Sequence, residues 1–301
     1  TYYYESFPSN KLELGLWLES ERMLHPVIDQ VGVDTQNEVV KEEKRQRYDA
    51  PYGKLLKVLN ENLFKVHPYK DENIGKMEHL DAATLEEFMA YHKTYYGPNN
   101  AVLIVAGDIE TEETIELVKK YFDEVPRGNE VVRNFPKEEP ITENIRAKAY
   151  DRNIQIPMLL STFRTPGFAS RDSYVLDMIS TYLSSGKSSV LYKKLVDNQK
   201  QALQTQVINL GQVDYNIFAI LALPLGEVPL DTLLTEIVEE IEKVQNELIS
   251  ERSYQKLLNK FESQFVNSNS SIAGIANSLA RYYLLYGDVN LINKEIDIYR
   301  S

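Results

Sequence analysis

The sequence has 301 residues, of which 43% are hydrophobic and 26% charged, and its formal net charge is −12. This composition is typical of a globular protein with one large domain or two of ordinary size, and no apolar run approaches the roughly 18 residues that span a membrane. The acidic balance argues against a nucleic-acid binder. Because the chain contains no cysteine, disulfides, thiol catalysis and thiolate metal sites are excluded.

Helices are expected to dominate the first part of the chain. Apolar residues at helical spacing predict a helix over Leu12–Leu24. A strongly charged helix follows, for which Asp34-Thr35 supplies an N-cap. Val39 and Val40 mark its expected buried side, and Pro51 breaks it.

The next elements include the first predicted strand. A helix is expected over Leu55–Leu63, and Thr84 with Glu87 forms a capping-box pattern that opens another. The continuous apolar run Ala101–Gly107 predicts a central strand, because a strand buried on both faces carries no polar alternation. A helix over Glu112–Tyr121 comes next.

Prolines and glycine among charges, without apolar periodicity, predict a linker over residues 128–140. The linker separates a domain at residues 1–127 from a second at 141–301. Because both mix strands and helices without βαβ alternation, we expect an α+β fold with mostly antiparallel sheets. The elements predicted in the second domain are strands over Arg146–Tyr150, Met158–Phe163, Gln204–Leu210 and Asn216–Leu223, a short helix holding Leu191 and Leu195, and helices over Asp172–Leu183, Asp231–Leu248, Glu251–Val266, Ile272–Tyr286 and from Leu291 onward.

The side chains that could carry chemistry are scattered. His25, His67, His79 and His92 show no metal-ligand spacing, so a structural role is the leading interpretation for each. The polar loop Ser184–Ser189 contains Ser-Gly-Lys-Ser, but it lacks the first glycine of a phosphate loop and lies between helices. We therefore do not expect it to act as a phosphate loop.

Glu42 and Glu43 follow Val39 and Val40 by about one helical turn. A carboxylate held against an apolar face is costly unless it is paired or bound to a cation. A solvated face of a charged helix is the alternative, since charge runs usually face water.

Several segments, in order along nearly the whole chain, resemble the pitrilysin/insulinase family. These are the inverted zincins, which include the mitochondrial processing peptidases, and the chain is most similar to their bacterial members. The resemblance implies two homologous α/β sandwich domains with mostly antiparallel sheets flanked by helices. The segments are Glu38–Gln46, His67-Pro68-Tyr69, Gly75, Tyr95–Ala101, Gly107-Asp108, Thr165-Pro166-Gly167 with Asp172, Leu183–Gly186 and Ser188–Tyr192.

The resemblance implies a Zn²⁺ ligand at Glu43, with Glu42 as the alternative, and an auxiliary acid position at Gln36. The family's H-x-x-E-H motif provides two histidine ligands and the general-base glutamate, and it does not occur in these 301 residues. The resemblance therefore places the general-base glutamate upstream of Thr1, in a preceding segment. A catalytic zinc site needs about three protein ligands, so this chain alone is not expected to hydrolyse peptides.

In the companion domain, the candidate substrate-binding residues are Arg281 and Tyr286. The resemblance implies that this domain closes over the peptide and contacts its carbonyls. An ordinary helix that ends at Gly287 is the alternative interpretation of this segment.

The resulting expectation is a fragment of a zinc metalloendopeptidase that acts on peptides or unfolded polypeptides in a chamber of two halves. The second half would come from a homodimer, a heterodimer or a fused domain pair, with no nucleic-acid partner. A bacterial periplasmic or cell-envelope location is preferred. Two alternatives stay open: a non-catalytic structural or substrate-binding subunit of the same family, and an unrelated α+β binding protein.

Overall fold

The computed structural model describes residues 1–301. It is rich in helices and holds a single three-stranded antiparallel sheet, which confirms the α+β class. No helix has the length and apolar content of a membrane span. The helices are α1 (Leu12–Leu24), α2 (Gln30–Asp49), α3 (Leu55–Leu63), α4 (Met77–Ala82), α5 (Leu85–Tyr95), α6 (Thr111–Phe122), α7 (Arg171–Ser184), the π-helix η4 (Tyr192–Asn198), α8 (Leu230–Asn246), α9 (Glu251–Ser268), α10 (Ile272–Tyr286) and α11 (Glu295–Arg300).

The sheet consists of β1 (Leu159–Pro166), β2 (Ala202–Leu210) and β3 (Tyr215–Pro224), in the order β1-β3-β2. The centre strand β3 pairs antiparallel with both neighbours, and Phe163 of β1 stands opposite Phe218 of β3. The short connection between β2 and β3 makes these antiparallel neighbours a hairpin, and both strands were predicted from the sequence.

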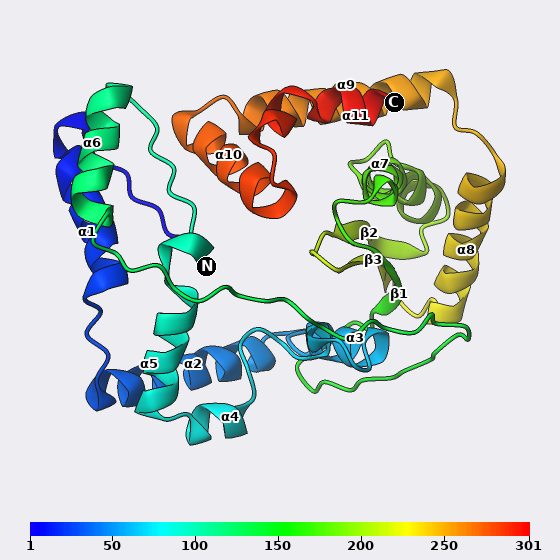
Figure 1. The fold of residues 1–301 in the computed structure, drawn as a ribbon. Helices are drawn as coiled ribbons and strands as arrows, with labels where there is room; N and C mark the ends of the chain where they lie inside the picture. Colours follow the sequence, from blue (N-terminus) through cyan, green and yellow to red (C-terminus); the bar gives the residue numbers. More distant parts are fainter.

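Strand β3 is covered on both faces. Phe218 and Ile220 belong to the main core cluster, which α7, η4 and α8 complete. Ile217 and Ala219 point to the opposite face, where they join a second cluster with the fully buried Phe64 at the end of α3. A helix from the first part of the chain therefore covers a sheet built by the second part, and Figure 1 shows α3 below the strands and α7 above them.

Several helix boundaries follow the capping signals of the sequence. Helices α1 and α10 have the predicted bounds, and Thr84 and Glu87 form the predicted capping box of α5. The predicted start of α2 was wrong: the helix begins after Asp29, whose Oδ1 accepts a hydrogen bond of 2.7 Å from the Gly32 N–H. Both aspartates can cap, so composition alone did not decide between them.

Two predicted strands do not form in the structure. Residues 101–107 and 146–150 make no backbone hydrogen bond and are not part of the sheet. The apolar run 101–107 also stays partly exposed, with 43% of Leu103 accessible. Their sequences favour extended backbone, but a strand needs a partner, and no neighbouring strand lies beside them. The sheet consequently lies entirely in residues 159–224.

A buried carboxylate joins the segment that follows α3 to the predicted linker. The Glu138 side chain is only 3% exposed. Its Oε1 accepts three hydrogen bonds of 2.7, 2.8 and 2.7 Å from the successive backbone N–H groups of residues 65–67. The backbone N–H of Glu138 in turn donates to the hydroxyl of Tyr215 on β3, at 2.9 Å. The linker is thus fixed to α3 and the sheet at this residue.

Arg164 on β1 completes this arrangement. Its side chain is 7% exposed, and Nη1 lies 3.2 Å from Glu138 Oε2. Nη1 also donates to the Leu63 carbonyl at 2.7 Å, and Nη2 donates to the Glu139 carbonyl. A buried guanidinium is tolerated only when acceptors satisfy its N–H donors. Here the acceptors are carbonyls at the end of α3 and in the linker. We call Glu138, Arg164 and the backbone of residues 65–67 the hinge lock.

His67 lies beside the hinge lock and is 2% exposed. Its Nδ1 accepts from the Tyr69 N–H at 3.2 Å, so the ring carries a proton on Nε2, which faces Asp214 Oδ2 at 3.4 Å. Arg133 pairs with the same carboxylate at 2.7 Å. These contacts give His67 a structural role in holding the loop after α3 against the β2–β3 turn.

Replacing Arg164 with methionine should lower the free energy of unfolding by about 3–5 kcal/mol, because it leaves a buried carboxylate without its cation. Urea denaturation measures the change. The control is Arg146→Met, which removes an ion pair with Asp231 in which the side chains are 78% and 81% exposed. That change should cost at most about 1 kcal/mol. Equal costs for the two variants would contradict a stabilising role for the hinge lock.

The hinge lock should also make stability depend on acid. Burial raises the pKa of Glu138, but the three backbone donors and Arg164 outweigh it and hold the pKa below its ordinary value of 4.5. The unfolded chain then binds the proton more tightly, so this stabilisation is present above pH ~4.5 and is lost as pH falls through the lower folded pKa. Glu138→Gln, which cannot titrate, should lose less stability than the wild type between about pH 5 and 3. Glu130→Gln, an exposed change in the same linker, should follow the wild type.

Candidate functional site

Helix α2 packs through a face that is partly polar. Val33, Asn37 and Lys44 are its buried residues, on one stripe. The Asn37 side-chain amide donates to the Leu80 carbonyl at 3.1 Å, and the Lys44 ammonium donates to the Gly75 carbonyl. The expectation that Val39 lies on the buried side was wrong, because it is 46% exposed. The polar residues occupy the packed face because backbone carbonyls of the segment before and within α4 satisfy them.

The other face of α2 carries the predicted metal ligand. Three carboxylates lie close together on this helix, and two of them pair with a base on the next turn: Glu38 with Lys41 at 2.7 Å and Glu42 with Arg45 at 3.2 Å. Glu43 makes no hydrogen bond and no ion pair, and its side chain is exposed near Val39. Of these three carboxylates, Glu43 is therefore the one that has no partner and could bind a cation.

The chain does not complete a metal site around Glu43. Its 301 residues contain no group of three histidine or carboxylate side chains placed to hold a metal ion. A single carboxylate does not satisfy the coordination of zinc, which takes four ligands in tetrahedral geometry. The residues of this chain alone thus do not fit a zinc ion.

The general-base glutamate also has no counterpart in this site. The resemblance implies a position upstream of Thr1, outside residues 1–301. Around Thr1 itself the chain is exposed and forms no helix or strand before residue 9. The general base and the two histidine ligands therefore remain expectations from the resemblance, and Glu43 is the one predicted member of the zinc site that the structure describes.

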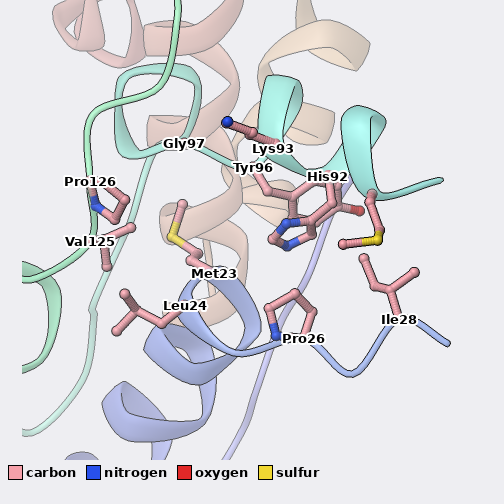
Figure 2. A pocket seen from close by; sticks show the side chains of 11 residues that line it. Met23, Leu24, Pro26, Ile28, His92, Lys93, Tyr96, Gly97, Val125 and Pro126 are labelled. Carbon is pink, nitrogen blue, oxygen red and sulfur yellow. The ribbon is translucent and has the colours of Figure 1, made fainter. Parts of the chain in front are cut away.

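His92 and His25 lie away from Glu43 and contact other protein groups. His92 stacks on Tyr96 with ring centres 4.6 Å apart, and its Nε2 lies 3.1 Å from the Arg22 carbonyl. Both residues line a hollow between the end of α1, α5 and Pro126, whose volume is about 260 Å³. Figure 2 shows the two rings beside each other at this hollow. His25 lies 2.9 Å from Glu21 on the surface. None of these contacts leads to Glu43.

The candidate substrate-binding residues Arg281 and Tyr286 both lie on α10, which ends at Gly287 in a left-handed conformation. Arg281 is exposed and forms no ion pair. Tyr286 is half-buried, with its ring edge-on to Phe168 at 4.9 Å, and burial raises its pKa. Tyr286 packs against Phe168 while Arg281 stays accessible, so the two residues differ in their surroundings.

A polar cluster that the sequence did not predict lies behind α10. Burial raises the pKa of Asp177 on α7, although two donors partly offset this: the Asn209 amide at 2.8 Å and the Tyr299 hydroxyl at 3.3 Å. The Tyr282 hydroxyl on α10 donates to Glu295 on α11. These contacts join α7, α10 and α11 across more than 100 residues, and no local pattern indicates them.

Comparisons with known proteins agree with this architecture. The family described as "Peptidase M16 inactive domain" matches residues 82–261. The zinc protease PqqE of Helicobacter pylori is 30% identical over 257 residues, which cover 84% of this chain and 58% of that protein. The chain spans about half the length of the curated relatives it matches.

Solved structures show the same fold. The crystal structure of a protease from Helicobacter pylori superposes with a TM-score of 0.88 and 26% identity, covering 97% of this chain and 71% of that one. The first half of the periplasmic protease PqqL from Escherichia coli gives a TM-score of 0.72 at 14% identity, covering 99% and 65%. The resemblance to zinc metallopeptidases that the sequence indicated is confirmed, and the chain belongs to the peptidase M16 inactive-domain family.

Proposed function

We propose that this chain provides one carboxylate ligand and a companion domain to a zinc-dependent endopeptidase that cleaves peptides or unfolded polypeptides. The observation that carries the proposal is the free Glu43 on the exposed face of α2, since its neighbours Glu38 and Glu42 are paired with bases. Relatives named zinc proteases support the metal. The remaining ligands and the general base would come from residues outside these 301.

A second half of the same fold is part of this proposal. One structural neighbour is described as the first half of a longer protease, which supports a two-half arrangement. A non-catalytic structural or substrate-binding subunit is the second candidate. The observation that favours it is the donor set of the chain, which offers no metal cluster of its own.

The native full-length protein should contain about one zinc per chain, and Glu43→Gln should lower both its zinc affinity and its peptidase activity by at least about 100-fold, because a ligand is lost. Elemental analysis after dialysis and cleavage of a quenched peptide measure the two effects. The matched control is Glu42→Gln, whose carboxylate already pairs with Arg45 and which should retain both. Equal losses in the two variants would contradict the assignment. A native protein without zinc or activity would favour the non-catalytic subunit.

Arg281 is proposed to bind a carbonyl or carboxylate of the substrate. Because its side chain is exposed and makes no ion pair, Arg281→Gln should lower the melting temperature only slightly, through the lost attraction to Asp177. It should raise KM for peptide by about tenfold, which corresponds to one lost charged hydrogen bond of about 1.4 kcal/mol. Steady-state kinetics of the native protein measure the change. Arg252→Gln, an equally exposed change on α9, is the control. An unchanged KM in Arg281→Gln would contradict a substrate-binding role for Arg281 and leave α10 with a structural role alone.

A further inference from the structure

A small polar hollow lies at the seam between α7 and α9, two helices that pack together in the second part of the chain (Figure 1). The loop after α7 contributes Ser185 and Ser188. The first turns of α9 contribute Ser253, Lys256 and Lys260. Hydroxyl and ammonium groups therefore converge here from a helix and the loop that faces it.

The two lysines of the hollow have only neutral partners. The Lys256 ammonium donates to the Ser188 hydroxyl at 2.5 Å, and the Lys260 ammonium donates to the Ser185 hydroxyl. Neither ammonium has a carboxylate within 4.0 Å, and no acidic residue lines the hollow. What sets these two lysines apart is their position, because both lie over the same hollow, whereas a lysine such as Lys194 pairs with carboxylates of its neighbouring helix.

Two like charges one turn apart on a helix repel each other. Each ammonium also has three donor hydrogens, and a single serine uses one of them. The seam thus holds two positive charges that oppose one another and have donors to spare. An anion placed between them would remove the repulsion and use the free donors.

The volume of the hollow is about 50 Å³. One water needs roughly 10–15 Å³ on this measure, so the space exceeds a single water and suits a group of a few heavy atoms. A tetrahedral oxyanion has acceptors in several directions, which matches donors that arrive from α9 on one side and from the loop on the other.

We propose that the α7–α9 seam binds a phosphate group through Lys256 and Lys260, with Ser185 and Ser188 as additional donors. This differs from a phosphate-loop interpretation of Ser184–Ser189. In a phosphate loop the lysine within the motif would hold the ligand, but Lys187 is exposed and does not line the hollow. The proposal does not depend on Glu43 or on peptidase activity.

The test is calorimetric titration of the native full-length protein with inorganic phosphate. The ionic strength is kept fixed, because salt screens the attraction between exposed lysines and phosphate. We expect one saturable site, whose affinity falls at least about tenfold in Lys256→Gln/Lys260→Gln, since two charged donors are lost. Lys187→Gln has the same kind of charge change in the adjacent loop and should stay within about twofold of the wild type, because an exposed charge outside the hollow contributes little. Circular dichroism and melting curves without phosphate verify that the variants fold.

A second titration uses tripolyphosphate. It tells whether the site binds a single free phosphate or a phosphate within a polyphosphate chain. Affinity equal to that of phosphate indicates a single free phosphate, whereas much tighter binding that also depends on Lys256 and Lys260 indicates a polyphosphate chain. Ser188→Ala keeps both charges and should weaken phosphate binding less than the double lysine variant. The proposal is overturned if phosphate shows no saturable binding up to about 10 mM, well above ordinary ligand affinities, or if Lys187→Gln weakens binding as much as the double variant.

Discussion

The arrangement of the two parts of this chain depends on one buried ion pair. Glu138 and Arg164 join the linker to β1, and both bind backbone groups at the end of α3. Because α3 also covers one face of the sheet, this pair fixes α3 and the loop that follows it against β1. Both charges are almost fully desolvated, and such a pair holds only when its geometry and hydrogen bonds are complete. The structure meets this condition through backbone donors and acceptors, which need no further side chain.

Local signals determined most helices but not the packing between them. Caps and apolar periodicity predicted α1, α5 and α10 well, since these signals act within a few residues. The buried polar face of α2 could not be predicted, because Asn37 and Lys44 are satisfied by carbonyls more than 30 residues away. The missed helix α4 is only six residues long and has little periodicity to detect.

In the candidate site, too, the sequence indicated a residue but not its contacts. The sequence pointed to Glu43 through its order within a set of family-like segments, and the structure adds that this carboxylate is unpaired. The pairing of the alternative, Glu42, with Arg45 could not be predicted from the sequence, because it depends on side-chain geometry. Lys256 and Lys260 were also beyond prediction, since the hydroxyls they contact lie about 70 residues away in the sequence.

The unpaired segment over residues 101–107 has a consequence for how the chain behaves in solution. Its backbone is extended, it is apolar, and it contains no proline or charged side chain. Natural proteins blunt such segments with charges, prolines or a covering element, because open backbone groups recruit further strands from any chain that presents them. Residues 101–107 therefore present unpaired backbone groups beside exposed apolar side chains, and we expect the solubility of this chain to improve when a strand pairs with them.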